Sequence, residues 1–321
     1  MKAVTPVPPR AFANLTLAST IHNNIVRWIE MAISFETHVG IPHEIVVVDD
    51  GSVEPVLING LKSKVRLIRN PVALGFCAAS ALALNSVSTP FGLLVDADIT
   101  FLPGDFAKAF ACFQTTAKAA WCNFSQIDRE GYIGSSIDRV IPPAWCFGLG
   151  NQVTELWAKM KNKSAAVTDA NAIERVPIAH SSSALVRMAA YESVGGFDLR
   201  YWQCQSDNDL CQRFTKRGWS VGFYRGYCVI HDGIGGKTGG LPRVYDLYRG
   251  KLMFYETHYP WSRIYLRPLL ALRHLAEAFA LLVRPRQGDH LRPAWRLALA
   301  WLVFRAYPPQ SSPSLHGNSR V

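Results

Sequence analysis

Long hydrophobic runs and paired cysteine motifs are lacking from this chain of 321 residues. No uninterrupted apolar run reaches the ~18–20 residues of a transmembrane helix. Its seven cysteines include no CxxC motif, which favours reduced thiols in a cytosolic protein. The opening MKAVTPVPPR has no apolar stretch of the kind that a signal peptide needs, so we expect no secretory signal. With 49% hydrophobic residues, the chain is too apolar for disorder.

The positive charge is concentrated near the C-terminus. Residues 1–258 hold 25 Lys and Arg against 22 Asp and Glu, whereas residues 259–321 hold nine Arg, no Lys and two acids. A nucleic-acid-binding protein would carry its basic residues among polar or stacking partners on the folded body. We therefore expect no nucleic-acid partner.

The first 250 residues alternate short apolar runs with longer segments of helical character. Apolar runs predict strands, and the segments between them predict helices. The expected strands are 15–21, 44–49, 65–68 and 91–95, and the expected helices are 24–35, 53–63 and 77–87. This alternation predicts an α/β fold with a Rossmann-like, mostly parallel central sheet flanked by helices.

Acidic clusters follow two of the expected strands. Asp49, Asp50 and Ser52 follow one, and Asp96 and Asp98 follow another. Ligands of open α/β sheets bind outside the carboxyl ends of the strands, so both clusters should face one crevice. Carboxylates at such a site suit Mg²⁺ or Mn²⁺, which in turn accepts phosphate oxygens. Each cluster alone is also compatible with a turn that caps a helix.

Four collinear segments resemble the inverting glycosyltransferases of family 2, which have the GT-A fold. The resemblance spans roughly residues 13–260 and is nearest to the bacterial cell-surface polysaccharide branch, including rhamnosyltransferase-like enzymes. Its segments are EIVVVDDGS at 44–52, RNPVALGF at 69–76, LLVDADITF at 93–101, and the block 182–236 with GGFD, D-x-DLC-x-R, Gly218 and His231.

The resemblance implies a donor and metal site. Asp49 or Asp50, together with Ser52, would bind the nucleoside of a nucleoside-diphosphate sugar, a UDP- or dTDP-sugar. Asp96 and Asp98 would form the DxD pair, with Asp98 as the direct ligand of Mn²⁺ or Mg²⁺. His231, which ends a β-like run, would complete the metal site; a satisfied histidine at a strand end is the structural alternative.

The resemblance further implies that Asp207 is the catalytic base, which takes the proton from the acceptor hydroxyl. Asp207 opens an expected helix, so a role in its first turn is the alternative, and the two roles are compatible. Lys237, in a glycine-rich segment, would meet the donor diphosphate. Ser206 stands where the family usually has a glutamate, and two asparagines of the family pattern are missing.

The C-terminal region predicts an amphipathic helix from about 263 to 284, kinked or beginning at Pro268. Its polar residues fall within an arc of about 120° at 100° per residue; they are Arg263, Arg267, Arg273, His274, Glu277 and Arg284. The apolar run 295–304 is too short to span a bilayer. An Arg-rich amphipathic helix suits an anionic membrane surface, although packing against the catalytic domain or a second subunit would give the same pattern.

These observations predict four regions: an N-terminal tail at 1–12, a GT-A catalytic domain at 13–260, an amphipathic helical extension at 261–307 and a disordered tail at 308–321. The expected activity is transfer of a sugar to a glycan or lipid-linked acceptor in cell-surface polysaccharide synthesis. The expected location is the cytoplasm, peripheral on the cytoplasmic face of the inner membrane. Two alternatives remain: a sugar-phosphate nucleotidyltransferase of related fold, and a catalytically degenerate, membrane-bound scaffold.

Overall fold

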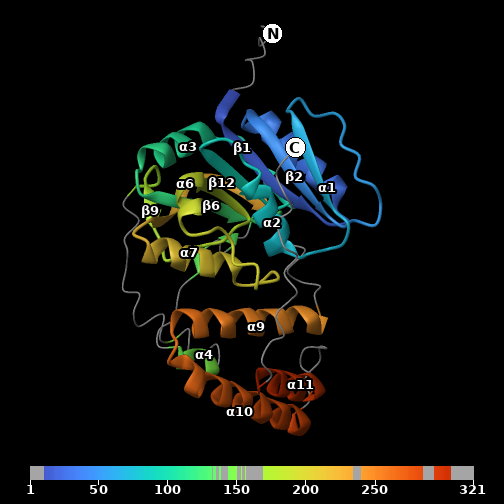
Figure 1. Cartoon of the computed structure of the whole chain (residues 1–321), viewed down its shortest axis with the longest axis vertical. Helices are drawn as coiled ribbons and strands as arrows, with labels where there is room; N and C mark the ends of the chain where they lie inside the picture. Colours follow the sequence, from blue (N-terminus) through green and yellow to red (C-terminus); the bar gives the residue numbers. More distant parts are fainter. Residues whose placement is uncertain are drawn as a thin grey trace, which may run out of the picture. The chain divides into compact units, whose positions relative to one another are not determined.

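Figure 1 shows the computed structural model of the chain. It describes residues 11–131, 133–134, 137–138, 144–149, 153, 156, 169–233, 240–284 and 293–304. The chain forms two compact units. We call residues 1–138, 167–197 and 207–237 the sheet unit, and residues 139–166, 198–206 and 238–321 the helical unit.

The sheet unit is built on a ten-stranded sheet whose main path is β3-β2-β1-β4-β11-β6-β12-β5, with β7 beside β6 and β9 beside β12. β1 is parallel to its neighbours β2 and β4, and β3 is parallel to β2. β6 and β12 are also parallel neighbours, whereas β11 runs antiparallel to β4 and β6. Strands β8 and β10 form a separate pair. The bounds are β1 (Ala11–Ile21), β2 (Ile41–Asp50), β3 (Val65–Asn70), β4 (Phe91–Val95), β5 (Ile99–Phe101), β6 (Ala119–Ile127), β7 (Ile133–Gly134), β8 (Ile137–Asp138), β9 (Ile173–Arg175), β10 (Ile178–Ala179), β11 (Ser183–Arg187) and β12 (Ser220–His231).

Helices cover both faces of this sheet (Figure 1). The helices of this part of the chain are α1 (Ile25–His38), α2 (Phe76–Asn85), α3 (Phe106–Thr115), α6 (Met188–Ser193) and α7 (Ser206–Lys216). Phenylalanines of α1 and α3, among them Phe35 and Phe106, pack with alternate residues of β1, β2 and β4 in one core cluster. On the opposite face, Gly92 of β4 lies beneath Leu84 of α2 and Met188 of α6.

The predicted α/β fold, with its central sheet between helices, is confirmed. Strand β4 is buried throughout, and β2 is buried from Glu44 to Asp50, as strands with both faces covered should be. β1 aligns Ile21 with Asp49 of β2 and Ser19 with Val95 of β4, so the carboxyl ends of three strands meet at one edge. The chain order 3-2-1-4 places a change of winding direction between β1 and β4, where open sheets bind their ligands.

The predicted helix at 53–63 is wrong, because this segment consists of bends and irregular backbone and contains no helix. Pro55 removes a backbone donor, and Gly60 adopts a positive φ of 82°. The backbone is held from outside instead: the carboxylate of Glu36 on α1 accepts hydrogen bonds from the amides of Lys62 and Ser63.

The helical unit contains α4 (Trp145–Leu149), α9 (Gly240–His258), α10 (Ser262–Val283) and α11 (Pro293–Phe304). Leu252, Tyr255, Leu266, Leu270 and Val303 belong to its apolar core. Helix α10 begins at Ser262, close to the expected 263, and contains Pro268; of the two alternatives for this proline, a kink or a helix start, the helix start is excluded. Within the described ranges, no helix is both long enough and apolar enough to cross a bilayer.

Candidate active site

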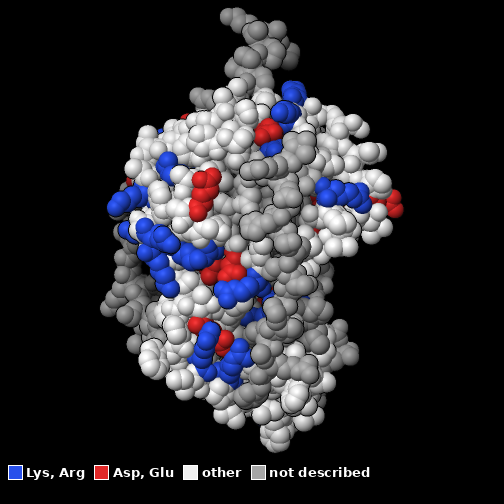
Figure 2. All heavy atoms as spheres, viewed as in Figure 1, with Lys and Arg blue, Asp and Glu red and all other residues white. Residues whose placement is uncertain are grey.

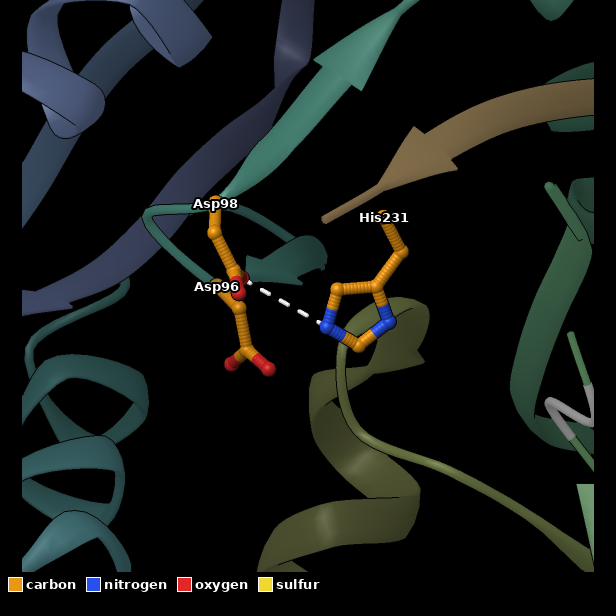
Figure 3. A group of neighbouring side chains, drawn as sticks. All are labelled: Asp96, Asp98 and His231. Atoms are coloured by element: carbon orange, nitrogen blue, oxygen red, sulfur yellow. Dashed lines mark ion pairs between the residues drawn. The ribbon is translucent and has the colours of Figure 1, made fainter. Parts of the chain in front are cut away.

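Asp96, Asp98 and His231 converge at the carboxyl edge of the sheet (Figure 3). The two aspartates follow β4, and His231 is the last residue of β12. Backbone pairing brings these segments together, because β12 pairs antiparallel with β5 and matches His231 with Ile99. One ligand atom from each of the three side chains lies within 4.8 Å of the others, and Nε2 of His231 is 3.5 Å from Oδ1 of Asp98.

The negative charge of the two aspartates is only partly offset by His231. Burial, reinforced by the negative charge of Asp98, raises the pKa of Asp96 to about 7. Burial works against ionisation of Asp98 as well, but the hydrogen bond and charge of His231 leave the pKa of Asp98 below its usual value. Two carboxylates and an imidazole are the donor set that a divalent cation such as Mn²⁺ prefers. A bound cation would also offset the repulsion that raises the pKa of Asp96, so these residues fit a metal site.

Gln126 of β6 orients the imidazole. Its Oε1 lies 3.0 Å from Nδ1 of His231, while its Nε2 donates to the hydroxyl oxygens of Ser182 and Ser183 at 2.5 and 3.2 Å. Since Oε1 can only accept, Nδ1 carries a proton, and Nε2 is the nitrogen that faces Asp98. Nε2 donates to the Asp98 carboxylate when it is protonated, and its lone pair becomes available to a metal when that proton leaves. Metal-binding histidines are oriented by such a second hydrogen bond. Sequence reasoning missed this residue, because a lone glutamine in an apolar strand matches no motif.

Asp207 lies beside the same cluster. It occupies the first turn of α7, as predicted, and the amide of Ser181 donates to its Oδ2 at 3.3 Å. Its negative charge contributes to the raised pKa of Asp96. The adjacent Ser182 accepts the amide hydrogen of Asp96 at 2.9 Å, so a single short segment positions both carboxylates.

The second acid of this helix has a structural role. Asp209 is buried and accepts a hydrogen bond from Nε of Arg213 at 2.7 Å. Arg213 in turn donates to the carbonyls of Val194 and Gly196. The D-x-DLC-x-R pattern therefore joins α7 to the GGFD turn.

Asp50 holds the loop that precedes α2. Its carboxylate accepts hydrogen bonds from the Asn70 side chain and from the amides of Leu74 and Gly75, all at 2.8–2.9 Å. Gly51 makes this approach feasible: its φ is 70°, and a Cβ there would lie 2.6 Å from backbone atoms of the loop. The Asp50 carboxylate therefore stabilises the loop between β3 and α2 through these three hydrogen bonds.

Asp49 and Ser52 lie at the same strand end. Oδ1 of Asp49 accepts the amide hydrogen of Ser52, and its buried Oδ2 faces the Arg69 guanidinium at 3.4 Å. The hydroxyl of Ser52 accepts a hydrogen bond from the amide of Asn23, which has a positive φ of 57°. Asn23 follows β1, and asparagine tolerates this left-handed conformation. The turn after β1 is thus tied to the end of β2.

A further ion-pair group lies next to His231. Asp232 pairs with Arg27 of α1 at 3.1 Å and with Arg129, which follows β6, through two contacts of 2.7 and 2.8 Å. The backbone amide of Asp232 also donates to the carbonyl of Asp98. Sequence reasoning missed this group because its members are far apart in the chain. Lys237, the predicted diphosphate contact, lies outside the described residues.

Comparison with known proteins agrees with this arrangement. The family model described as glycosyl transferase family 2 matches residues 32–195, about half of the chain. No curated protein matches the chain significantly in sequence. Among solved structures, the mannosyltransferase PcManGT from Pyrobaculum calidifontis, in complex with GDP-Man and Mn²⁺, is similar with a TM-score of 0.51 and 12% identity. That similarity covers 94% of this chain and 87% of that one.

A second similar structure is GalNAc-T7 with UDP, GalNAc and Mn²⁺, with a TM-score of 0.50 and 16% identity over 68% of this chain. The match covers 43% of GalNAc-T7, so this chain corresponds to less than half of that protein. At such identities the likeness concerns the fold, which in both cases is that of a glycosyltransferase. The family match, the fold and the strand-end acids together place the chain in glycosyl transferase family 2, with the GT-A fold.

Proposed function

We propose that this family 2 protein transfers a sugar from a nucleoside-diphosphate sugar to a glycan or lipid-linked acceptor, with inversion and with help from a divalent metal. The observation that carries the proposal is the convergence of Asp96, Asp98 and His231 at one sheet edge, with Asp207 beside them. The alternative of a nucleotidyltransferase lacks a comparable feature, because the turn after β1 is Ile21-His22-Asn23 and carries no glycine-rich basic loop.

Asp98 and His231 would hold Mn²⁺ or Mg²⁺, and Asp96 would act at the same place on the metal, the ribose or the diphosphate. The similar structures named above contain Mn²⁺, which supports this choice. When bound, the metal supplies positive charge that stabilises a departing diphosphate. Gln126 would keep Nε2 of His231 available by retaining the proton on Nδ1.

Asp207 would take the proton of the acceptor hydroxyl while that oxygen attacks the anomeric carbon. An ionised carboxylate is required for this step, and the amides of Ser181 and Asn208, which donate to Asp207, hold it in a fixed orientation. Asp209 is unsuited to the role because Arg213 already occupies it.

The donor would be a UDP- or dTDP-sugar bound between the ends of β1 and β2. Asp49 and Ser52 lie where the nucleoside would sit, and Asp50 would act through the loop that it holds. Lys237 would approach the diphosphate.

The wider context is also part of the proposal. The acceptor chemistry fits cell-surface polysaccharide synthesis of the rhamnosyltransferase-like branch, at the cytoplasmic face of the inner membrane. The catalytic domain would extend over 13–260, the extension at 261–307 would contact an anionic membrane surface, and 1–12 and 308–321 would be tails.

A panel of UDP-, dTDP- and GDP-sugars, tested with and without Mn²⁺ by thermal shift and donor hydrolysis, tests the function. We expect at least one donor to stabilise the protein only when the metal is present. Asp207→Asn should then reduce transfer by about 10²- to 10⁴-fold while donor affinity stays nearly unchanged, because the base acts on the acceptor.

Asp105→Asn is the matched control, since Asp105 caps α3 and asparagine caps equally well. If no donor stabilises the protein, the enzymatic function is wrong and a scaffold role is favoured. If Asp207→Asn abolishes donor binding too, Asp207 is not the base.

A further inference from the structure

Helix α10 is amphipathic, but its polar side is turned inward. His274 is fully buried, with its ring 4.8 Å from that of Tyr248. Arg267 is paired with Glu256 of α9 and donates to the carbonyl of Val303 on α11. Four of the six residues of the predicted polar arc, Arg267, Arg273, His274 and Glu277, take part in contacts within the helical unit.

Glu277 joins the two final helices. Its carboxylate contacts Arg273 at 2.9 Å on the same helix and Arg296 of α11 at 3.1 Å. The hydrogen-bond and ionic partners of Glu277 outweigh its burial and lower its pKa to about 2. This part of the polar arc is therefore the side on which α10 is joined to α9 and α11.

The opposite side of α10 is exposed and apolar. Large hydrophobic side chains recur along it at helical spacing, and each is 64–70% exposed; they are Ile264, Leu272, Phe279 and Leu282. Trp261, 80% exposed, lies at its N-terminal end. We call these five residues the apolar face. In Figure 2 the edge of the surface along α10 that faces away from α9 is almost uniformly white, whereas blue and red spheres gather nearer α9.

Charge indicates what covers this face. Arg263 and Arg284 are exposed at the two ends of α10, and residues 259–321 carry a net charge of +7 from nine Arg and two acids. A second copy would bring the same positive charge to the contact. A bilayer that contains anionic lipid offers both the apolar interior and the negative headgroups. Tryptophan favours the boundary between the two.

We propose that the apolar face inserts into the headgroup–acyl boundary of an anionic bilayer, with Arg263 and Arg284 against lipid phosphates. The proposal deepens the proposed function, because it assigns the membrane contact to a particular surface. It rests on the proposed function for the lipid-linked acceptor. Binding should depend mainly on apolar insertion and so should resist salt, because screening weakens only the headgroup contacts.

The test uses the full chain with vesicles of phosphatidylglycerol and phosphatidylcholine at equal proportions. We expect the triple variant Leu272→Gln, Phe279→Gln and Leu282→Gln to lower the partition coefficient at least tenfold. The double variant Arg263→Gln and Arg284→Gln should lower it only about threefold, and 0.5 M NaCl should leave most of the wild type bound. Leu272→Gln alone is matched by Leu57→Gln, which changes a leucine of the sheet unit that is 74% exposed, against 64% for Leu272, and which should leave partitioning unchanged.

A triple variant that still binds as the wild type does overturns the proposal. So does a wild type that is dimeric by light scattering and ignores vesicles, while the triple variant is monomeric. Circular dichroism and thermal unfolding confirm that each variant is folded, which is expected because the substituted side chains are exposed. Donor-dependent thermal shift separates the two hypotheses. Vesicle binding without a donor response refutes the proposed sugar transfer alone. A donor response without vesicle binding refutes this inference, together with the membrane contact proposed for 261–307, and leaves the sugar transfer standing.

Discussion

The pKa values of two acidic side chains, one in each unit, are shifted in opposite directions. At the sheet edge, His231 lowers the pKa of Asp98, but burial and the neighbouring charges of Asp98 and Asp207 raise the pKa of Asp96 to about 7. In the helical unit, Glu277 lies between Arg273 and Arg296, and its pKa falls to about 2. Ion pairs within a structural core tend to be complete, since an unpaired buried charge is costly. An incomplete cluster is therefore the better indication of a ligand site.

The apolar side chains show the same contrast. In the sheet unit exposed residues such as Leu57 accompany a large core between α1, α3 and the strands, whereas in the helical unit exposed apolar side chains recur at helical spacing along one side of α10. Exposed apolar patches of this extent are uncommon on a protein without a partner. The residues that deviate from ordinary packing in each unit are the residues to which we assign a function.

The largest effect is expected from Asp98→Asn. Removal of the proposed direct metal ligand should lower metal-dependent transfer by about 10³-fold, equivalent to about 4 kcal/mol of transition-state stabilisation. Mn²⁺ titration by calorimetry should show a matching loss of affinity. Glu277→Gln is the comparison from the helical unit and should leave kcat/KM for a water-soluble acceptor within about twofold. Equal losses in the two variants would show that the contrast between the clusters has no functional meaning.

An intermediate effect is expected from Gln126→Leu. Without the Oε1 acceptor, the imidazole of His231 loses its fixed tautomer, and Mn²⁺ affinity should fall by about 10- to 100-fold. Gln126→Glu should restore most of the affinity, because a carboxylate also accepts the Nδ1 proton. A purely structural role would lower the melting temperature in both variants and leave the metal affinity of the folded protein unchanged.

The smallest effects are those on stability, and they should have opposite signs in the two units. The pKa of Glu277 is lower in the folded chain than its usual value of 4.5, so this residue stabilises the fold above pH 4.5 and ceases to do so as the pH falls toward 2. Since Glu277 is about one-third exposed, solvent screening limits the expected loss in Glu277→Gln to about 2 kcal/mol at pH 7.

For Asp96 the direction is reversed. Its pKa is raised in the folded chain, so the ionised carboxylate destabilises the metal-free protein at pH 8. Asp96→Asn should therefore raise the melting temperature by a few degrees, roughly 2–4 °C per kcal/mol, when EDTA is present. Thermal unfolding at pH 8 checks both variants together, and shifts of the same sign would contradict the proposed difference between the clusters.

The sequence predicted the strand ends well because their signals are local. A continuous apolar run such as 91–95 must be covered on both faces, and the acids that follow it must emerge where the strand ends. The helix beginning near Asp207 was confirmed for the same reason, since acids in a first turn favour a helix start. The prediction of a helix at 53–63 was wrong because the backbone of this segment is held by Glu36 on another element.

What the sequence alone determined about this protein is the order of its elements, the position of its acids at strand ends and the amphipathic period of α10. Only the tertiary structure decided which distant groups meet: Gln126 with His231, Asp232 with Arg27 and Arg129, and Glu277 with Arg296. It also decided which side of α10 is covered. Periodicity fixes the angle between the polar and apolar sides of a helix, but the partners against which the helix packs determine which side meets the solvent.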